Sequence, residues 1–204
     1  SKEFSYPEFE NGMKILSCAG DGENDMMMNI TVYRMGAGSE RTLRSPAEEM
    51  AVLLVTGHIR LAWEGQEAEG KGPCCLHVPR DVKVTIQAVA DSEVLVQTTE
   101  NAHPFDSKFY RPQDCRDDIF GLDVYDNKMK RTVRTVFDYK NAPYSNMVCG
   151  EVVNHQGGWS SYTPHHHPQP EVYYYRYERG EGFGACFLGD DVYKVKDGTC
   201  ACIP

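Results

Sequence analysis

Three consecutive histidines followed by a glutamate are the residues of this chain best suited to bind a metal ion. They lie in the stretch PHHHPQPE, residues 164–171. His165 and His167 are two residues apart, so on an extended backbone their side chains point to the same side while His166 points away. The two prolines that follow cannot donate ladder hydrogen bonds, so we expect a turn there and a strand that begins at Glu171.

Two imidazoles and one carboxylate that leave coordination positions open are typical of a catalytic site for a divalent metal ion. We therefore predict that His165, His167 and Glu171 are metal ligands, without a choice among zinc, manganese, iron and nickel. By alternation, Tyr173 and Tyr175 share the face of Glu171 and are candidates for orienting substrate hydroxyls or relaying protons. A solvated polar turn is the alternative for the histidines, and aromatic filling of a barrel interior is the alternative for the tyrosines.

The elements that must position these residues are short strands. Apolar runs such as MAVLLVTG, HIRLAWEG, DVKVTIQAV and EVYYYRYERG are rich in β-branched and aromatic residues and are separated by turn residues. In DVKVTIQAV, Val82, Val84 and Ile86 alternate with polar residues, as in a half-buried strand. Many short strands with frequent turns predict an all-β protein built as an antiparallel sandwich or barrel.

A loose internal repeat predicts two lobes, residues 1–115 and 116–204. In the first half Glu49 leads a strand, and Gly57, Gly72 and Pro79 follow; in the second half Glu171 leads a strand, and Gly180, Gly198 and Pro204 follow. The first copy continues through two more strands after Pro79, whereas the second stops at Pro204. The second barrel is therefore expected to lack its closing strands, through truncation (which we favour) or because another chain covers that edge as in a homo-oligomer.

Composition excludes several classes of function. The net charge is −9 and the pI is about 5.2, so neither nucleic acid nor an anionic membrane is expected as the main partner. No apolar run is long enough to span a membrane, and no signal peptide is visible. The eight cysteines show no disulfide-scaffold spacing, which favours a reducing cytoplasm, although a thiolate metal site at Cys200 and Cys202 is an alternative.

The stretch GGWSSYTPHHHPQPEVYYYRY resembles the metal motif of the cupin superfamily, a glycine before H-x-H, then a glutamate and a later glycine. His165, His167 and Glu171 match its core, and GTCACIP, residues 198–204, matches the start of the second cupin motif. That motif implies a fourth ligand, a histidine, beyond Pro204. The first half has Leu43 and Ser45 in place of the two histidines, so its lobe is expected to be metal-free and structural.

More narrowly, RTVRTVFD, SNMVCGEVVNHQGGWSSYTPHHHP and EVYYYRYERGEGFG resemble the bicupin 5-deoxy-glucuronate isomerase family of myo-inositol catabolism. The resemblance is strongest over residues 128–204. It implies two tandem cupin (double-stranded β-helix, jelly-roll) barrels, the second incomplete, and a metal-dependent aldose–ketose isomerase. The implied reaction converts 5-deoxy-glucuronate to 5-dehydro-2-deoxy-gluconate. In such a reaction a divalent cation stabilises an enediolate while a base moves the proton.

The substrate of such an isomerase is a small anionic sugar, whose carboxylate requires a cation. Arg131 and Arg134 in RTVRTVFD are the candidates, with surface ion pairs as the alternative role. Three other functions stay open: an enzyme like the more distantly similar 5-keto-4-deoxyuronate isomerase, a metal-dependent cupin oxygenase, and a degenerate cupin that binds sugar without catalysis.

Overall fold

The structure is all-β, as the strand patterns predict. A computed structural model describes residues 4–5, 7–22, 25–161 and 163–204. Strands make up nearly all of the regular structure in these ranges, which also contain the 3₁₀ turn η2 (Pro112–Asp114). Within the described ranges there is no helix long and apolar enough to cross a membrane.

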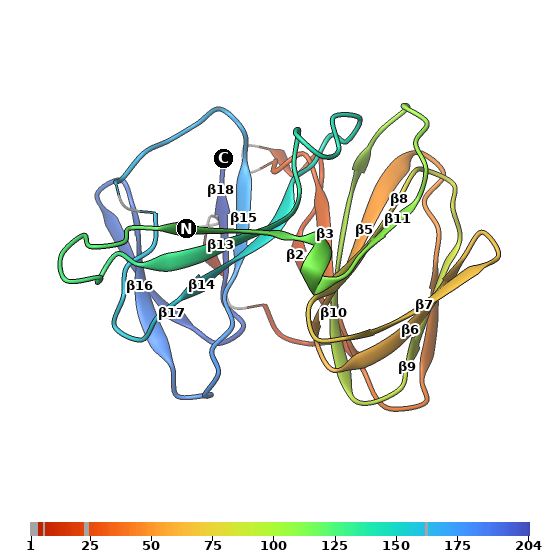
Figure 1. The fold of residues 1–204 in the computed structure, drawn as a ribbon, viewed down its shortest axis with the longest axis horizontal. Helices are drawn as coiled ribbons and strands as arrows, with labels where there is room; N and C mark the ends of the chain where they lie inside the picture. Colours follow the sequence, from red (N-terminus) through yellow and green to blue (C-terminus); the bar gives the residue numbers. More distant parts are fainter. Residues whose placement is uncertain (1–3, 6, 23–24, 162) are drawn as a thin grey trace.

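Two lobes lie side by side (Figure 1). The strands of the first lobe are β2 (Met13–Ser17), β3 (Asn29–Met35), β4 (Glu40–Leu43), β5 (Glu48–Thr56), β6 (His58–Trp63), β7 (Gln66–Lys71), β8 (Cys74–Val78), β9 (Val84–Ala88), β10 (Ser92–Glu100) and β11 (Lys108–Tyr110). The strands of the second lobe are β1 (Phe4–Ser5), β12 (Arg116–Phe120), β13 (Arg131–Phe137), β14 (Cys149–Asn154), β15 (Glu171–Tyr174), β16 (Phe183–Leu188), β17 (Asp191–Lys196) and β18 (Cys200–Ile203). The predicted division of the chain after residue 115 stays a prediction.

The first lobe consists of two antiparallel sheets that enclose an apolar core. One sheet has the order β11-β8-β5-β10-β3-β2 and the other the order β4-β9-β6-β7. Side chains that point inward from both sheets are fully buried, among them Val52 and Leu54 of β5, Leu61 of β6 and Ile86 of β9. The alternation predicted for residues 82–87 is confirmed, because Val84 and Ile86 are buried while Thr85 and Gln87 are partly exposed.

The second lobe contains three smaller sheets, β12-β13-β14, β16-β17 and β1-β18-β15. The last of these joins segments from opposite parts of the chain, because the backbone at 4–5 pairs with β18 in antiparallel register. In that register Ser5 lies opposite Cys200, and β15 pairs with the other edge of β18. The strand that begins at Glu171 therefore lies in a sheet completed by the N-terminal segment.

The two lobes meet along the outer face of the large sheet of the first lobe. Leu16 of β2 and Ile30 of β3 pack with Val172 and Cys202 of the second lobe. Farther along, Ala51 of β5 and Cys75 of β8 pack against Phe137 and Met147. Alternation along β5 thus sends one set of residues into the first barrel and the other set toward the second lobe.

Candidate active site

The predicted strand at Glu171 exists, and its register fixes which side chains face inward. In the pairing of β15 with β18, Glu171 lies opposite Ile203 and Tyr173 lies opposite Ala201. The ladder continues past β15, since the Tyr175 amide donates to the carbonyl of Thr199 at 2.9 Å. Residues 164–170 form an irregular connection before the strand, as the two prolines predict.

His167 and Glu171 lie next to each other at the start of this strand. His167 Nε2 is 3.1 Å from Glu171 Oε1, and both side chains are more than a third exposed. The ring of His165 lies on the same side, with its centroid 6.3 Å from that of His167. The Nδ1 atom of His165 is 2.7 Å from the carbonyl oxygen of Thr163. If Nδ1–H donates that bond, Nε2 keeps its lone pair for a ligand.

The three predicted metal ligands are not equally close to one another. His167 and Glu171 form a pair, while His165 lies beyond it. Across the described ranges, with residue 162 inside this motif left out, no three histidine, cysteine, aspartate or glutamate side chains are grouped so that they could hold a metal ion. Metal binding by His165, His167 and Glu171 therefore stays a prediction.

Both predicted tyrosines share the inward face of Glu171. The phenol of Tyr173 donates to Glu171 Oε2 at 2.9 Å, so the carboxyl group has one oxygen beside a phenol and the other beside an imidazole. Burial, reinforced by the charge of Glu171, raises the pKa of Tyr173 to about 12. Burial also raises the pKa of Tyr175, whose phenol lies 3.5 Å from the sulfur of Cys186. Both phenols are therefore protonated at neutral pH and act there as hydrogen-bond donors.

The alternate residues of the same segment connect the two lobes. Tyr174 donates to Glu93 Oε1 of β10 at 2.9 Å, and the Arg176 guanidinium also bonds to Glu93, which is buried. The guanidinium further contacts Asp197 at 2.9 Å. The segment thus has one face toward the candidate site and one face fixed to the first lobe, so the Glu93 contacts hold Glu171 and Tyr173 in orientation.

The two predicted substrate-binding arginines lie in β13. Arg134 is bonded to Asp117 through two nitrogens at 2.8 Å and to Glu151 at 2.8 Å. These carboxylates raise the pKa of Arg134 and neutralise its charge. Arg131 is buried and donates to the carbonyl of Met129 at 3.2 Å. The contacts of Arg134 match the alternative role named above, ion pairing. Substrate binding by Arg131 and Arg134 stays a prediction.

One buried polar cluster was not predicted from the sequence. Glu49, the proposed counterpart of Glu171, points away from the interior of the first barrel and bonds to His77 at 2.7 Å. It also accepts bonds from Ser145 and from the backbone amide of Asn146 in the second lobe. A histidine within the apolar run CCLHV was the available indication, because a polar side chain inside such a strand requires a partner.

The family and the fold follow from comparisons with known proteins. A model of the KduI/IolB family matches residues 5–204. The 5-deoxy-glucuronate isomerase of Bacillus subtilis (strain 168) is 24% identical over 196 residues, which cover 86% of this chain and 71% of that protein. The 5-deoxy-glucuronate isomerase of Geobacillus kaustophilus (strain HTA426) is 23% identical over 175 residues, covering 76% of this chain and 62% of that one.

Solved structures confirm the fold. An IolB-like protein from Salmonella typhimurium LT2 superimposes with a TM-score of 0.83 at 17% identity, over 98% of this chain and 84% of that one. A putative glyoxylate induced protein from Pseudomonas aeruginosa has a TM-score of 0.69 at 14% identity, over 100% of this chain and 75% of that one. The β cupin fold and the family resemblance are thus confirmed, and the matches indicate an isomerase. The chain belongs to the KduI/IolB family.

Proposed function

We propose that the chain isomerises a sugar acid between its aldose and ketose forms, with 5-deoxy-glucuronate as substrate and 5-dehydro-2-deoxy-gluconate as product. The names of the curated relatives support the substrate. The observation that carries the proposal is the environment of Glu171. One of its oxygens lies 3.1 Å from His167 Nε2, and the other accepts the phenol of Tyr173 at 2.9 Å.

A divalent metal ion suits the chemistry of the donors at this position. His167 Nε2 and Glu171 Oε1 lie 3.1 Å apart, close enough that an imidazole nitrogen and a carboxylate oxygen would be able to bind the same ion. The Nδ1 contact of His165 with Thr163 leaves its Nε2 as the ligand atom. We propose that His165, His167 and Glu171 hold the ion, whose identity the donors leave open.

The tyrosines of the site supply protons rather than remove them. A bound divalent cation would act as a Lewis acid on the oxygens of an enediolate. Aldose–ketose isomerisation also moves a proton between the two oxygens of the substrate. Tyr173, whose pKa is raised to about 12, keeps its phenolic proton at neutral pH and can donate from Oη to a developing alkoxide. Tyr175, protonated for the same reason, orients a substrate hydroxyl.

The carboxylate of the substrate requires a positive partner. We retain Arg131 and Arg134 as the proposed residues for this role. Arg134 would have to exchange at least one of its present partners, Asp117 or Glu151, for the substrate carboxylate. Such an exchange replaces one charge-assisted hydrogen bond by another, so binding through Arg134 would gain little affinity but would fix the orientation of the sugar.

A second candidate function is sugar binding without catalysis. One observation favours it: the three proposed ligands are not grouped, with 6.3 Å between the ring centroids of His165 and His167.

The two candidates differ in an assay of the purified chain. We expect conversion of 5-deoxy-glucuronate, followed by proton NMR, and about one equivalent of divalent metal by mass spectrometry. Glu171→Gln and His167→Ala should remove both the metal and the activity, and a chelator should have the same effect on the unaltered chain. His166→Ala is the matched control, because alternation turns its side chain away, and it should keep both. A chain that binds the sugar acid but holds no metal and makes no product would contradict the isomerase proposal.

A further inference from the structure

The first lobe contains a recess at the position where the second lobe has its candidate site. Its volume is about 270 Å³, and it lies among β3, β4, β5 and β10. The lining residues are Asn29, Thr31, Tyr33, Leu43, Arg44, Ser45, Glu48, Met50, Val96 and Thr98. Such a volume is close to the lower end of small-molecule sites in proteins.

The strand registers define the correspondence between the two lobes. Met50 lies opposite Val78, the residue before Pro79, just as Glu171 lies opposite Ile203, the residue before Pro204. Met50 therefore takes the place of Glu171, and both residues face the interior of their lobe. Leu43 and Ser45, which the spacing of the sequence repeat aligned with His165 and His167, line the same recess. Leu43, Ser45 and Met50 carry neither an imidazole nor a carboxylate, and the recess remains open between them.

The lining divides into an apolar floor and a polar wall. Tyr33, Met50 and Val96 are buried and form the floor. Glu48 is the centre of the wall, since Oε1 accepts from Asn29 Nδ2 at 2.6 Å and Oε2 accepts from Ser45 Oγ at 2.8 Å. A carboxylate can accept about four hydrogen bonds, so each oxygen retains an acceptor position.

Two further hydroxyl groups border the recess. Thr98 Oγ1 has only a long contact, 3.5 Å, with Asn29, and the Thr31 hydroxyl has no hydrogen bond to the described residues. Both side chains are partly exposed. They alternate with buried residues on the adjacent, antiparallel strands β3 and β10, in which Asn29 lies opposite Thr98 and Thr31 lies opposite Val96.

Charge selects the class of ligand. Glu48 contributes a negative charge to the recess, whereas the guanidinium of Arg44 is paired with Asp81 at 2.8 Å. The recess therefore disfavours an anion such as the proposed sugar-acid substrate. A carboxylate and hydroxyl groups above an apolar floor are instead complementary to a neutral polyol, which has hydroxyls at its rim and C–H groups on its face.

We propose that this recess binds a neutral polyol, a monosaccharide or cyclic polyol, as a second site that is separate from the His165–Glu171 site. The carboxylate of Glu48 accepts hydrogen bonds from the ligand hydroxyls. Thr31 and Thr98 bond to further hydroxyls, and Met50 and Val96 pack against the C–H face.

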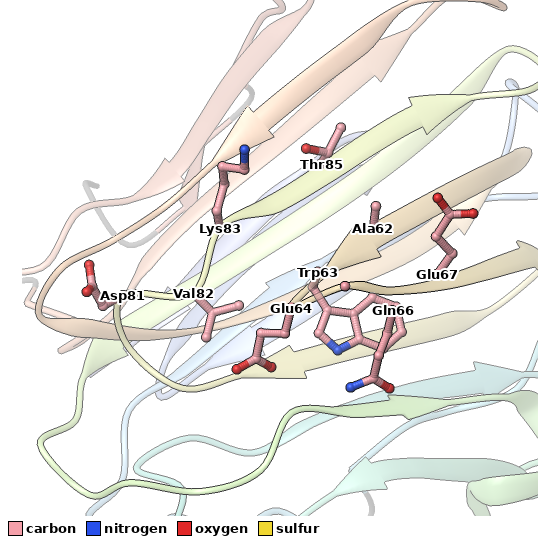
Figure 2. Close-up of a pocket in the computed structure, with 10 residues that line it drawn as sticks. Ala62, Trp63, Glu64, Gln66, Glu67, Asp81, Val82, Lys83 and Thr85 are labelled. Carbon is pink, nitrogen blue, oxygen red and sulfur yellow. The ribbon is translucent and has the colours of Figure 1, made fainter.

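A larger recess of the same lobe, bordered by Asp81, does not have the same character. It encloses about 500 Å³ near the β6–β7 turn and around Trp63. Figure 2 shows the charged groups of Glu67, Asp81 and Lys83 spread around it rather than converging on one point. Asp81 is already paired with Arg44, so the polar groups there are less suited to hold one small ligand.

The test compares two sugars that differ in one carboxylate, D-glucose and D-glucuronate, titrated into the isotope-labelled chain and followed by NMR. We expect glucose to shift the resonances of Thr31, Glu48 and Thr98, and to bind more tightly there than glucuronate. Thr31→Val and Thr98→Val, which replace a hydroxyl by a methyl group, should each weaken glucose binding about three- to tenfold. Thr56→Val, at the exposed far end of β5, is the matched control and should have no effect.

Two further variants test the role of the Glu48 charge and the independence of this recess from the site in the second lobe. Glu48→Gln should weaken glucose binding and reduce the preference over glucuronate. Glu171→Gln, in the second lobe, should leave glucose binding at Thr31 and Thr98 unchanged. The proposal is overturned if glucose shifts no resonance of the recess, if glucuronate binds there more tightly, or if folded Thr31→Val and Thr98→Val chains both bind glucose as the unaltered chain does.

Discussion

Glu49 and His77 share a hydrogen bond of 2.7 Å, from Nε2 to Oε2, with no exposed surface on either side chain. The ring of His77 stacks on Phe137 of the second lobe, with centroids 4.2 Å apart and planes 4° apart. Ser145 and the amide of Asn146 bond to the same carboxyl group. This carboxyl group is therefore a point at which the second lobe is attached to the first.

Removal of the Glu49 carboxyl group should destabilise the chain strongly. Glu49→Ala leaves several buried donors without an acceptor, and we expect a loss of about 3 to 5 kcal/mol in the free energy of unfolding, measured with urea. Glu67→Ala, on the exposed strand β7, is the matched control and should change the free energy little. Equal effects of the two substitutions would show that the buried cluster does not stabilise the contact between the lobes.

Loss of the Tyr173 hydroxyl should lower turnover. Tyr173→Phe removes the proton donor beside Glu171 while keeping the ring in its cluster, so we expect kcat to fall about 100-fold with a small change in KM. Tyr193→Phe, in the same aromatic cluster, is the control and should leave kcat nearly unchanged. A Tyr173→Phe chain with normal turnover would exclude proton transfer by this phenol.

Acid should destabilise the chain in part through Asp197. Burial alone would raise the pKa of Asp197, but hydrogen bonds from the Tyr177 amide and from Arg176 outweigh burial and hold the pKa below its ordinary value of 3.8. The stabilisation is therefore complete above pH 3.8 and disappears as the pH falls through the lowered pKa. Thermal melts between pH 2 and 6 should show a shallower acid dependence in Asp197→Asn than in the unaltered chain. Identical slopes would contradict this assignment.

A side chain at residue 57 should not fit. Gly57 alone connects β5 to β6 at a φ of +108°, and a Cβ there would lie 2.4 Å from Ser92 Oγ and 2.5 Å from the Asp91 carbonyl. Gly57→Ala should cost about 2 to 4 kcal/mol in the free energy of unfolding. Gly65→Ala, in the β6–β7 turn with a φ of +75° and open space around it, should cost only about 1 kcal/mol. Chemical denaturation of both variants checks the order, and the reverse order would refute the steric argument.

The sequence predicts local features of this protein well, because alternation acts over a few residues. The predicted common face of Glu171, Tyr173 and Tyr175 is confirmed, and the alternate residues Tyr174 and Arg176 face the first lobe instead. Spacing alone does not fix the register of the repeat at Glu49. The sequence repeat makes Glu49 the counterpart of Glu171, but the strand registers show that Met50 is the counterpart. This shift of one residue exchanges the two faces of the strand.

The sequence patterns do not predict contacts between residues that are far apart in the chain. The pairing of Glu93 with Arg176 joins residues 83 positions apart, and no local periodicity encodes it. The ion pairs of Arg134 with Asp117 and Glu151 depend on how β12, β13 and β14 align, which the sequence alone left open. The distance between His165 and His167 depends on an irregular connection whose path the two prolines restrict but do not determine.

The pairing of the backbone at 4–5 with β18 has a consequence for biosynthesis. Ser5 and Cys200 are neighbours in one sheet, so that sheet cannot close until the ribosome has produced almost two hundred residues after the first of its strands. The barrel of β2–β11 has no such requirement and can assemble while translation continues. Residues 4–5 of the nascent chain must therefore stay unpaired through this interval, and the half that carries His167 and Glu171 completes its folding late.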